Sequence, residues 1–69
     1  MIREKLLLVG AGGFGRVVLE HATKEYDCAF IDDGVAIGTN VCGAPVIGKI
    51  SDLEELHKDY YLLVVTIGN

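Results

Sequence analysis

The stretch Leu6-Leu7-Leu8-Val9-Gly10-Ala11-Gly12-Gly13-Phe14-Gly15-Arg16 decides the fold of this chain. Its first part is a continuous apolar run, which is typical of a strand covered on both faces of a parallel sheet. The glycines that follow interrupt the strand and predict a tight turn, and a helical pattern begins directly after them. The stretch therefore predicts a buried strand, a glycine turn and a helix in direct succession.

The glycines of this turn have the spacing G-x-G-x-x-G at Gly10, Gly12 and Gly15. In dinucleotide-binding folds the first glycine allows the turn, the second lets a pyrophosphate approach the backbone, and the third lets the helix pack closely. The helix N-terminus also offers unpaired N–H groups and positive dipole charge. We therefore expect the backbone of Gly12, Gly13 and Phe14 to hold a phosphate. The alternative is that the glycines serve only a tight connection.

A helix is predicted from about residue 13 to Lys24, because apolar side chains recur there at helical spacing. A helix of this kind packs its apolar face on the sheet. His21 is expected to be a packed histidine on that face rather than a catalytic one. The side chains expected to face the sheet are Phe14, Val17, Val18, His21 and Ala22.

A second strand is predicted at Cys28–Ile31, and two acidic residues follow it. Asp32 lies 22 positions after Gly10, close to the spacing of about 20 at which an acidic residue contacts a ribose in βαβ nucleotide sites. Asp32 and Asp33 are therefore candidates to accept hydrogen bonds from a ribose or a base. Because neighbouring strand residues point to opposite faces, they are not expected to share one substrate atom. The alternative is that both are turn residues.

The second half of the chain opens with a long glycine-punctuated loop over residues 35–49. Within it, Pro45–Ile47 is predicted to form a short edge strand, where proline is tolerated. A capping box then predicts a helix start, with Ser51 as N-cap and Glu54 at the third helical position.

The chain finishes with a predicted strand at Tyr60–Ile67, rich in aromatic and β-branched residues. Gly68 and Asn69 follow it, at the edge where open α/β sheets bind ligands. We expect one α/β domain over residues 1–69, a small Rossmann-like βαβ(β)αβ unit with a parallel sheet, and we expect it to be a fragment of a longer chain.

Composition and charge exclude several classes of function. The net charge is −4 and no basic cluster occurs, which disfavours nucleic-acid binding. The apolar run after Met1 is too short for a membrane span or a signal sequence. Cys28 and Cys42 form no C-x-x-C motif, so we expect reduced thiols and a cytoplasmic location. No metal-ligand cluster and no nucleophilic set with either histidine is recognisable.

Four segments together resemble a known family. They are Gly10-Ala11-Gly12-Gly13-Phe14-Gly15-Arg16, Phe30-Ile31-Asp32-Asp33, Pro45-Val46-Ile47-Gly48 and Val65-Thr66-Ile67-Gly68-Asn69. In this order and spacing they look like the N-terminal domain of the PglD/NeuD-like sugar acyltransferases. These enzymes join a small Rossmann-like domain to a left-handed β-helix of hexapeptide repeats.

The resemblance implies that this domain holds a nucleotide sugar, typically a UDP-sugar. The β-helix of the family binds acetyl-CoA as co-substrate, supplies the catalytic histidine and forms a homotrimer. The resemblance therefore implies no catalytic residue in residues 1–69 and no cofactor bound by this domain itself. Members often have histidine where this chain has Phe14, so one polar side-chain contact is missing here. Carried over by position, the substrate-binding residues are Gly12, Gly13, Phe14, Asp32, Asp33 and Gly68.

Two other functions remain open on the sequence. The first is an NAD(P)-binding half-domain of an oxidoreductase, in which Asp32 contacts the adenosine ribose. Its difficulty is that Asp32 leads into a long glycine-containing loop rather than into another full helix. The second is a non-enzymatic ligand sensor or assembly module, in which a partner covers Tyr60, Tyr61 or the apolar loop residues.

Overall fold

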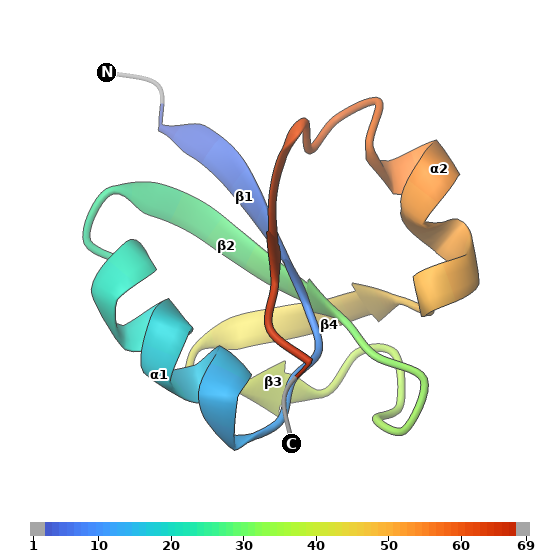
Figure 1. Ribbon diagram of the computed structural model, residues 1–69, viewed down its shortest axis with the longest axis horizontal. Coiled ribbons are helices and arrows are strands. Elements are labelled where there is room, and N and C mark those ends of the chain that lie inside the picture. The colour runs from blue at the N-terminus through green and yellow to red at the C-terminus, as the bar shows by residue number, and fades with distance from the viewer. Residues whose placement is uncertain (1–2, 68–69) are drawn as a thin grey trace.

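A five-stranded sheet with helices on both faces forms the architecture of the computed structural model, which describes residues 3–67 (Figure 1). The strand order is β3-β4-β2-β1-β5. All neighbours pair in parallel except β3, which is antiparallel to β4. The predicted Rossmann-like α/β class is therefore confirmed. The elements are β1 Glu4–Val9, α1 Gly13–Ala22, β2 Tyr26–Ile31, β3 Asn40–Val41, β4 Ala44–Gly48, the 3₁₀ turn η1 Ile50–Asp52, α2 Leu53–Leu56 and β5 Leu62–Val65.

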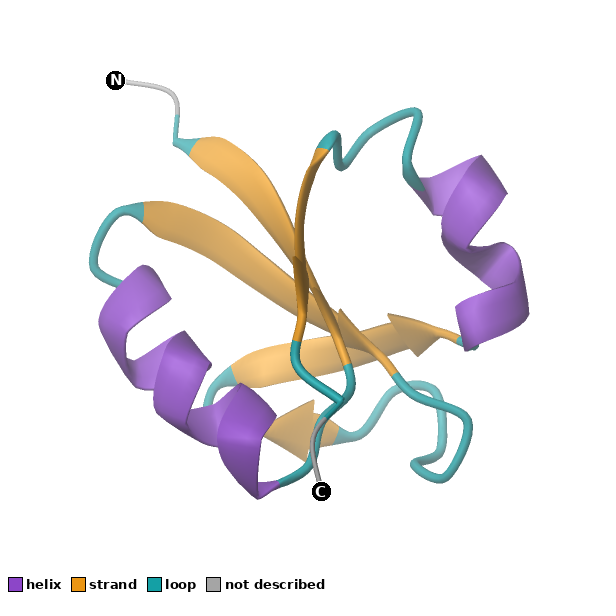
Figure 2. Ribbon diagram, in the orientation of Figure 1, coloured by secondary structure: helices purple, strands orange, loops and turns teal. Residues whose placement is uncertain are grey.

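Strand β1 is an interior strand of the sheet, between β2 and β5, and it is covered on both faces, as the apolar run predicts. It pairs with β2 along its whole length and with β5 from Leu6 to Val9. Its side chains alternate between two hydrophobic clusters, with Leu6 and Leu8 on the α1 face and Leu7 and Val9 on the α2 face. Leu7 and Leu8 are completely buried. The two faces are visible in Figure 2, where the helices lie on opposite sides of the strands.

The predicted contact face of α1 is right for Val18 and Ala22, which pack against the core cluster, and wrong for its other three residues. Phe14 and Val17 are both 55% exposed, and His21 is exposed as well. The buried residues of α1 are Gly15 and Leu19. The rotation of α1 follows from its close approach to the turn. Only glycine permits this approach at position 15, because a Cβ there would collide with the carbonyl oxygen of Gly10. A helix that must bring Gly15 against β1 also brings Leu19, one turn later, into the core.

The predicted edge strand is wrong in its place in the sheet. Strand β4 lies between β2 and β3, so the two-residue β3 forms that edge. Proline is tolerated in β4 because the pairing with β2 is made by Val46 and Gly48, while Pro45 lies opposite Asn40 of β3. A short hairpin therefore replaces part of the expected loop.

The predicted capping box at Ser51 and Glu54 is also wrong. The helical segment begins two residues earlier, with Lys49 as N-cap of η1. The Asp52 carboxylate accepts the backbone N–H of Lys49 at 2.8 Å, which satisfies an otherwise free donor. Leu53 and Leu56 of α2 then pack against the sheet cluster that contains Leu7.

Strand β5 is shorter than expected and leaves apolar side chains in solvent. Tyr61 is 67% exposed, Val65 66% and Ile67 59%. These residues alternate with the half-buried Leu62 and Val64, which pack on the α1 face. No helix within residues 3–67 is long and apolar enough to cross a membrane.

Candidate functional site

A cavity of about 200 Å³ lies where the carboxyl ends of β1 and β5 meet the glycine turn. Carboxyl ends of parallel strands are where open α/β sheets bind ligands. In Figure 1 the red end of the described chain lies beside the blue turn that precedes α1. The residues that line the cavity are Gly10, Gly12, Gly13, Phe14, Asp32, Thr66 and Ile67.

The glycines of the turn divide into two kinds. Gly10 has a φ of 113°, and a Cβ there would lie 2.9 Å from Cγ1 of Ile67. Gly10 and Gly15 are thus required by the protein itself. A Cβ at Gly12 or Gly13 would meet no atom within 4 Å, and neither residue has a positive φ. The packing of the described residues gives no reason for glycine at these two positions, but the approach of a ligand to the backbone does.

The N-terminus of α1 carries free backbone donors. No hydrogen bond between residues 3 and 67 uses the N–H groups of Gly12, Gly13 or Phe14. Gly12 is the N-cap and supplies no side-chain cap, and the first turn of α1 contains no acidic residue. The partial positive charge of this helix end therefore has no cap from its own first turn and faces the cavity, which suits an anion.

Asp32 is the predicted acidic residue that does reach the cavity. Its Oδ2 accepts the backbone N–H of Ala11 at 2.8 Å, and its Oδ1 accepts that of Gly34 at 2.7 Å. These two hydrogen bonds, the one from Ala11 foremost, hold the pKa of Asp32 below its usual range. The side chain is thus ionised, and it joins the end of β2 to the glycine turn. A carboxylate has about four acceptor positions, so it can accept further hydrogen bonds from a ligand.

Asp33 is placed differently from its neighbour. It is exposed, and its Oδ1 accepts the backbone N–H of Ile50 at 2.9 Å, at the start of η1. It does not line the cavity. The two carboxylates therefore point apart, as residues at successive positions of an extended chain do. The remaining predicted contact, Gly68, lies outside the described residues.

Thr66 and Ile67 are lining residues that the sequence analysis did not single out. Thr66 is 2% exposed, and its hydroxyl lies 2.6 Å from the carbonyl oxygen of Gly10. Two signals were available: both residues belong to the family segment at residues 65–69, and Thr66 is a hydroxyl residue at the end of an apolar strand.

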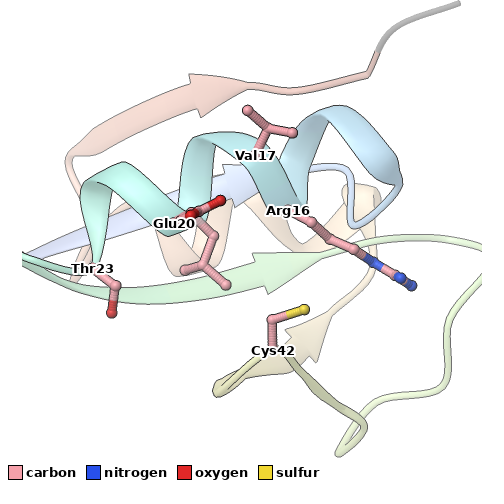
Figure 3. A pocket seen from close by; sticks show the side chains of 6 residues that line it. Arg16, Val17, Glu20, Thr23 and Cys42 are labelled. Atoms are coloured by element: carbon pink, nitrogen blue, oxygen red, sulfur yellow. The ribbon is translucent and has the colours of Figure 1, made fainter.

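A second cavity, of about 420 Å³, lies between α1 and the β3–β4 turn (Figure 3). It is lined by Arg16, Val17, Leu19, Glu20, Thr23 and Cys42. Figure 3 shows the Cys42 side chain across from α1, and no histidine is among the residues that line this cavity. The other cysteine, Cys28, is half-buried in β2, and burial raises the pKa of its thiol. Within residues 3–67 no three potential metal ligands gather.

Comparison with known proteins identifies the family. Residues 5–69 match the family described as the PglD N-terminal domain. The chain belongs to the PglD N-terminal domain family. A search of curated proteins returned no match to this chain.

Two solved structures resemble this PglD N-terminal domain closely. The acetyltransferase domain of PglB from Neisseria gonorrhoeae, in complex with acetyl coenzyme A, is 38% identical, with a TM-score of 0.76 over 99% of this chain. A point mutant of perosamine N-acetyltransferase from Caulobacter crescentus, in complex with CoA and GDP-perosamine, is 31% identical, with a TM-score of 0.73 over 91% of this chain. The chain spans 34% and 30% of their respective lengths.

Both structures come from acetyltransferases that are longer than this chain. Both structures contain acetyl coenzyme A or CoA. The oxidoreductase alternative is not favoured, since neither relative is a dehydrogenase. The relatives leave open which part of a substrate this domain itself contacts.

Proposed function

We propose that this PglD N-terminal domain binds the nucleoside diphosphate portion of a UDP-linked sugar for an acetyl-CoA-dependent sugar N- or O-acetyltransferase. One observation carries the proposal. Three N–H groups at the start of α1, which have no partner within residues 3–67, face a cavity beside an ionised Asp32, and the two glycines among them are not required by the packing of those residues. Backbone donors, helix dipole and an unobstructed approach together favour a phosphate group.

In this proposal the diphosphate lies against the backbone of Gly12, Gly13 and Phe14. Asp32 accepts a hydrogen bond from a ribose hydroxyl or from a ring N–H of the base. The Phe14 side chain, which is 55% exposed at the cavity, covers one side of the ligand with an apolar surface. Gly68 is proposed as a further backbone contact, while Asp33 contributes indirectly by holding the start of η1.

The base of the nucleotide is a separate part of the proposal. Uracil and guanine both carry a ring N–H that a carboxylate can accept, so Asp32 suits either. The Caulobacter relative is in complex with a GDP-linked sugar. UDP and GDP sugars must therefore be compared directly, with UDP expected to bind more tightly on the family resemblance.

The acetyl transfer itself belongs, in this proposal, to parts of the enzyme outside residues 1–69. A histidine there removes a proton from the sugar amine or hydroxyl as it attacks the thioester carbonyl of acetyl-CoA. The acyl C–S bond breaks, and CoA leaves as the thiol. This domain contributes substrate binding and orientation.

The test is calorimetric titration of the chain with UDP, a UDP-amino sugar, GDP and NADH. We expect saturable binding of the UDP compounds that is lost at high salt, because the contact is with a charged diphosphate. Binding of NADH without binding of any nucleotide sugar would contradict the proposal and restore the oxidoreductase alternative.

We also propose that the protein self-associates, as the family resemblance implies. Support comes from the edge strand β5, where Val65 is 66% exposed, and from Tyr61 directly before it, which is 67% exposed. Exposed apolar side chains gathered along one sheet edge are typical of surfaces that are covered in an assembly. Sedimentation velocity over a wide concentration range tests this, and a monomer at every concentration would contradict it.

A further inference from the structure

Among the residues that the structure describes, Thr66 is the polar residue that is buried, with 2% of its surface exposed. Its backbone N–H donates to the Val9 carbonyl at 2.9 Å, which continues the β1–β5 pairing by one residue. Its hydroxyl lies 2.6 Å from the carbonyl oxygen of Gly10 and 3.0 Å from that of Val9. A hydroxyl has one hydrogen to donate. Since the Val9 carbonyl already accepts the Thr66 N–H, the shorter contact makes Gly10 the main acceptor.

Hydrogen bonds to β2 and β5, the strands on either side of β1, therefore hold the N–H and the carbonyl of Gly10. The N–H of Gly10 donates to the Ile31 carbonyl at the end of β2, at 2.9 Å. The carbonyl of Gly10 accepts the Thr66 hydroxyl from the end of β5. This same carbonyl lies against Gly15, where any Cβ would collide with it. Its orientation thus determines how closely α1 approaches the turn.

A glycine turn needs such a contact because glycine has little conformational preference of its own. Gly10 sits at a φ of 113°, in a region that glycine can leave at little cost. Rotation at Gly10 would move the Gly12, Gly13 and Phe14 N–H groups that follow it. The Thr66 hydroxyl opposes that rotation, and the hydrogen bond from Ala11 to Asp32 holds the next residue.

We infer that Thr66 is a positioning residue for the phosphate-binding turn, acting through the Gly10 carbonyl. The inference rests on the proposed function, because it concerns the same cavity. It adds that strand β5, and not only β1 and α1, determines the direction in which the backbone N–H groups of residues 12–14 point. The hydroxyl oxygen of Thr66 is the group responsible, and its methyl group only fills space.

The experiment separates hydroxyl from methyl in the 69-residue chain. Thr66→Val keeps the shape and removes the hydroxyl, while Thr66→Ser keeps the hydroxyl and removes the methyl. We expect Thr66→Val to bind UDP about tenfold more weakly, which corresponds to about 1.4 kcal/mol. We expect Thr66→Ser to bind UDP within about twofold of wild type, although urea unfolds it more easily because a buried methyl group is lost. If Thr66 acted on stability alone, the variant that loses more stability would also lose more UDP affinity.

Amide hydrogen exchange provides a readout that needs no nucleotide. We expect Thr66→Val to speed exchange at the Gly10 and Ala11 amides relative to Leu8 in the middle of β1, and Thr66→Ser to leave the ratio unchanged. If wild type binds no UDP compound but this pattern holds, the proposed function fails and the positioning of the turn stands. Wild-type exchange at the turn, or unchanged UDP affinity, in a folded Thr66→Val would overturn the inference. If Thr66→Val does not fold, Thr66→Ser and Thr66→Ala are compared in the same way, since they differ by one oxygen atom.

Discussion

The carboxylate of Asp32 accepts a 2.8 Å hydrogen bond from the backbone N–H of Ala11, which lies 21 residues earlier in the chain. The contact joins the end of β2 to the glycine turn after β1. Asp32 is therefore part of the structure of the turn before it is a ligand contact. Any substitution of Asp32 must be read with both roles in view.

The first prediction concerns the stability that Asp32 provides. In Asp32→Asn the amide offers one acceptor oxygen, so either Ala11 or Gly34 loses its partner. We expect a loss of about 1–2 kcal/mol in the free energy of unfolding, the size of a hydrogen bond to a charged acceptor at a partly exposed site. Urea denaturation followed by circular dichroism measures it. The matched control is Asp59→Asn, an exposed position where we expect a change within about 0.5 kcal/mol. Equal effects at both positions would contradict the prediction.

The second prediction concerns pH. The folded pKa of Asp32 is lowered from 3.8, first by the Ala11 hydrogen bond and then by the Gly34 hydrogen bond. A lowered folded pKa gives stability that is fully present above the unfolded pKa and is lost as pH falls through the folded one. The stability difference between wild type and Asp32→Asn should thus be constant near neutral pH and shrink below about pH 4. Urea denaturation at a series of pH values measures it, and a difference that grows toward acid would contradict the sign.

The third prediction separates folding from binding at Gly13. A Cβ at Gly13 meets no protein atom within 4 Å, and alanine is a better helix former than glycine. We expect Gly13→Ala to be as stable as wild type or up to about 1 kcal/mol more stable. We also expect its UDP affinity to fall at least about tenfold, since the methyl group enters the cavity beside the phosphate position. Unchanged affinity in Gly13→Ala would argue against the proposed diphosphate position.

The fourth prediction is the opposite outcome at Gly15. Here an added Cβ collides with the Gly10 carbonyl and also lies 3.2 Å from Cε1 of Phe30. We expect Gly15→Ala to lose about 1–3 kcal/mol of stability, as overpacking does in a well-packed core. Thermal unfolding beside Gly13→Ala provides the comparison. A stable Gly15→Ala would mean that α1 does not approach β1 as closely as described.

The fifth prediction tests which face of α1 packs on the sheet. Leu19 is 3% exposed, so Leu19→Ala should cost about 2–5 kcal/mol. Val17 is 55% exposed, so Val17→Ala should stay within about 0.5 kcal/mol of wild type. Urea denaturation measures both variants. The reverse ranking would support the face predicted from periodicity.

That face illustrates where sequence reasoning failed. Periodicity alone grouped Phe14, Val17 and His21 with the buried residues, because it registers spacing and not the rotation of a helix about its axis. The rotation is decided by Gly15, whose missing side chain allows contact with the Gly10 carbonyl. The glycine spacing predicts the close packing at Gly15, and the structure adds that this packing turns Leu19 into the core.

The helix start after β4 shows a similar limit. Ser51 and Glu54 match a capping box, yet the helical segment begins at Ile50, with Asp52 accepting the Lys49 N–H. The Ile50 N–H also donates to the carboxylate of Asp33, which lies 17 positions earlier in the chain. Local motifs compete for the same helix start, and here a distant side chain favours one of them.

The sequence by itself determined the βαβ order of β1, α1 and β2, the burial of β1 on both faces, the glycine turn and the acidic residue after β2. Each follows from local physics, because apolar continuity, glycine spacing and strand ends are written in neighbouring residues. Only the tertiary structure decided that Asp32 faces the turn, that Asp33 faces η1 and that Thr66 holds Gly10. Those outcomes depend on hydrogen bonds between residues that lie 17 to 56 positions apart. Such bonds exist only once the parallel strands have brought their carboxyl ends together.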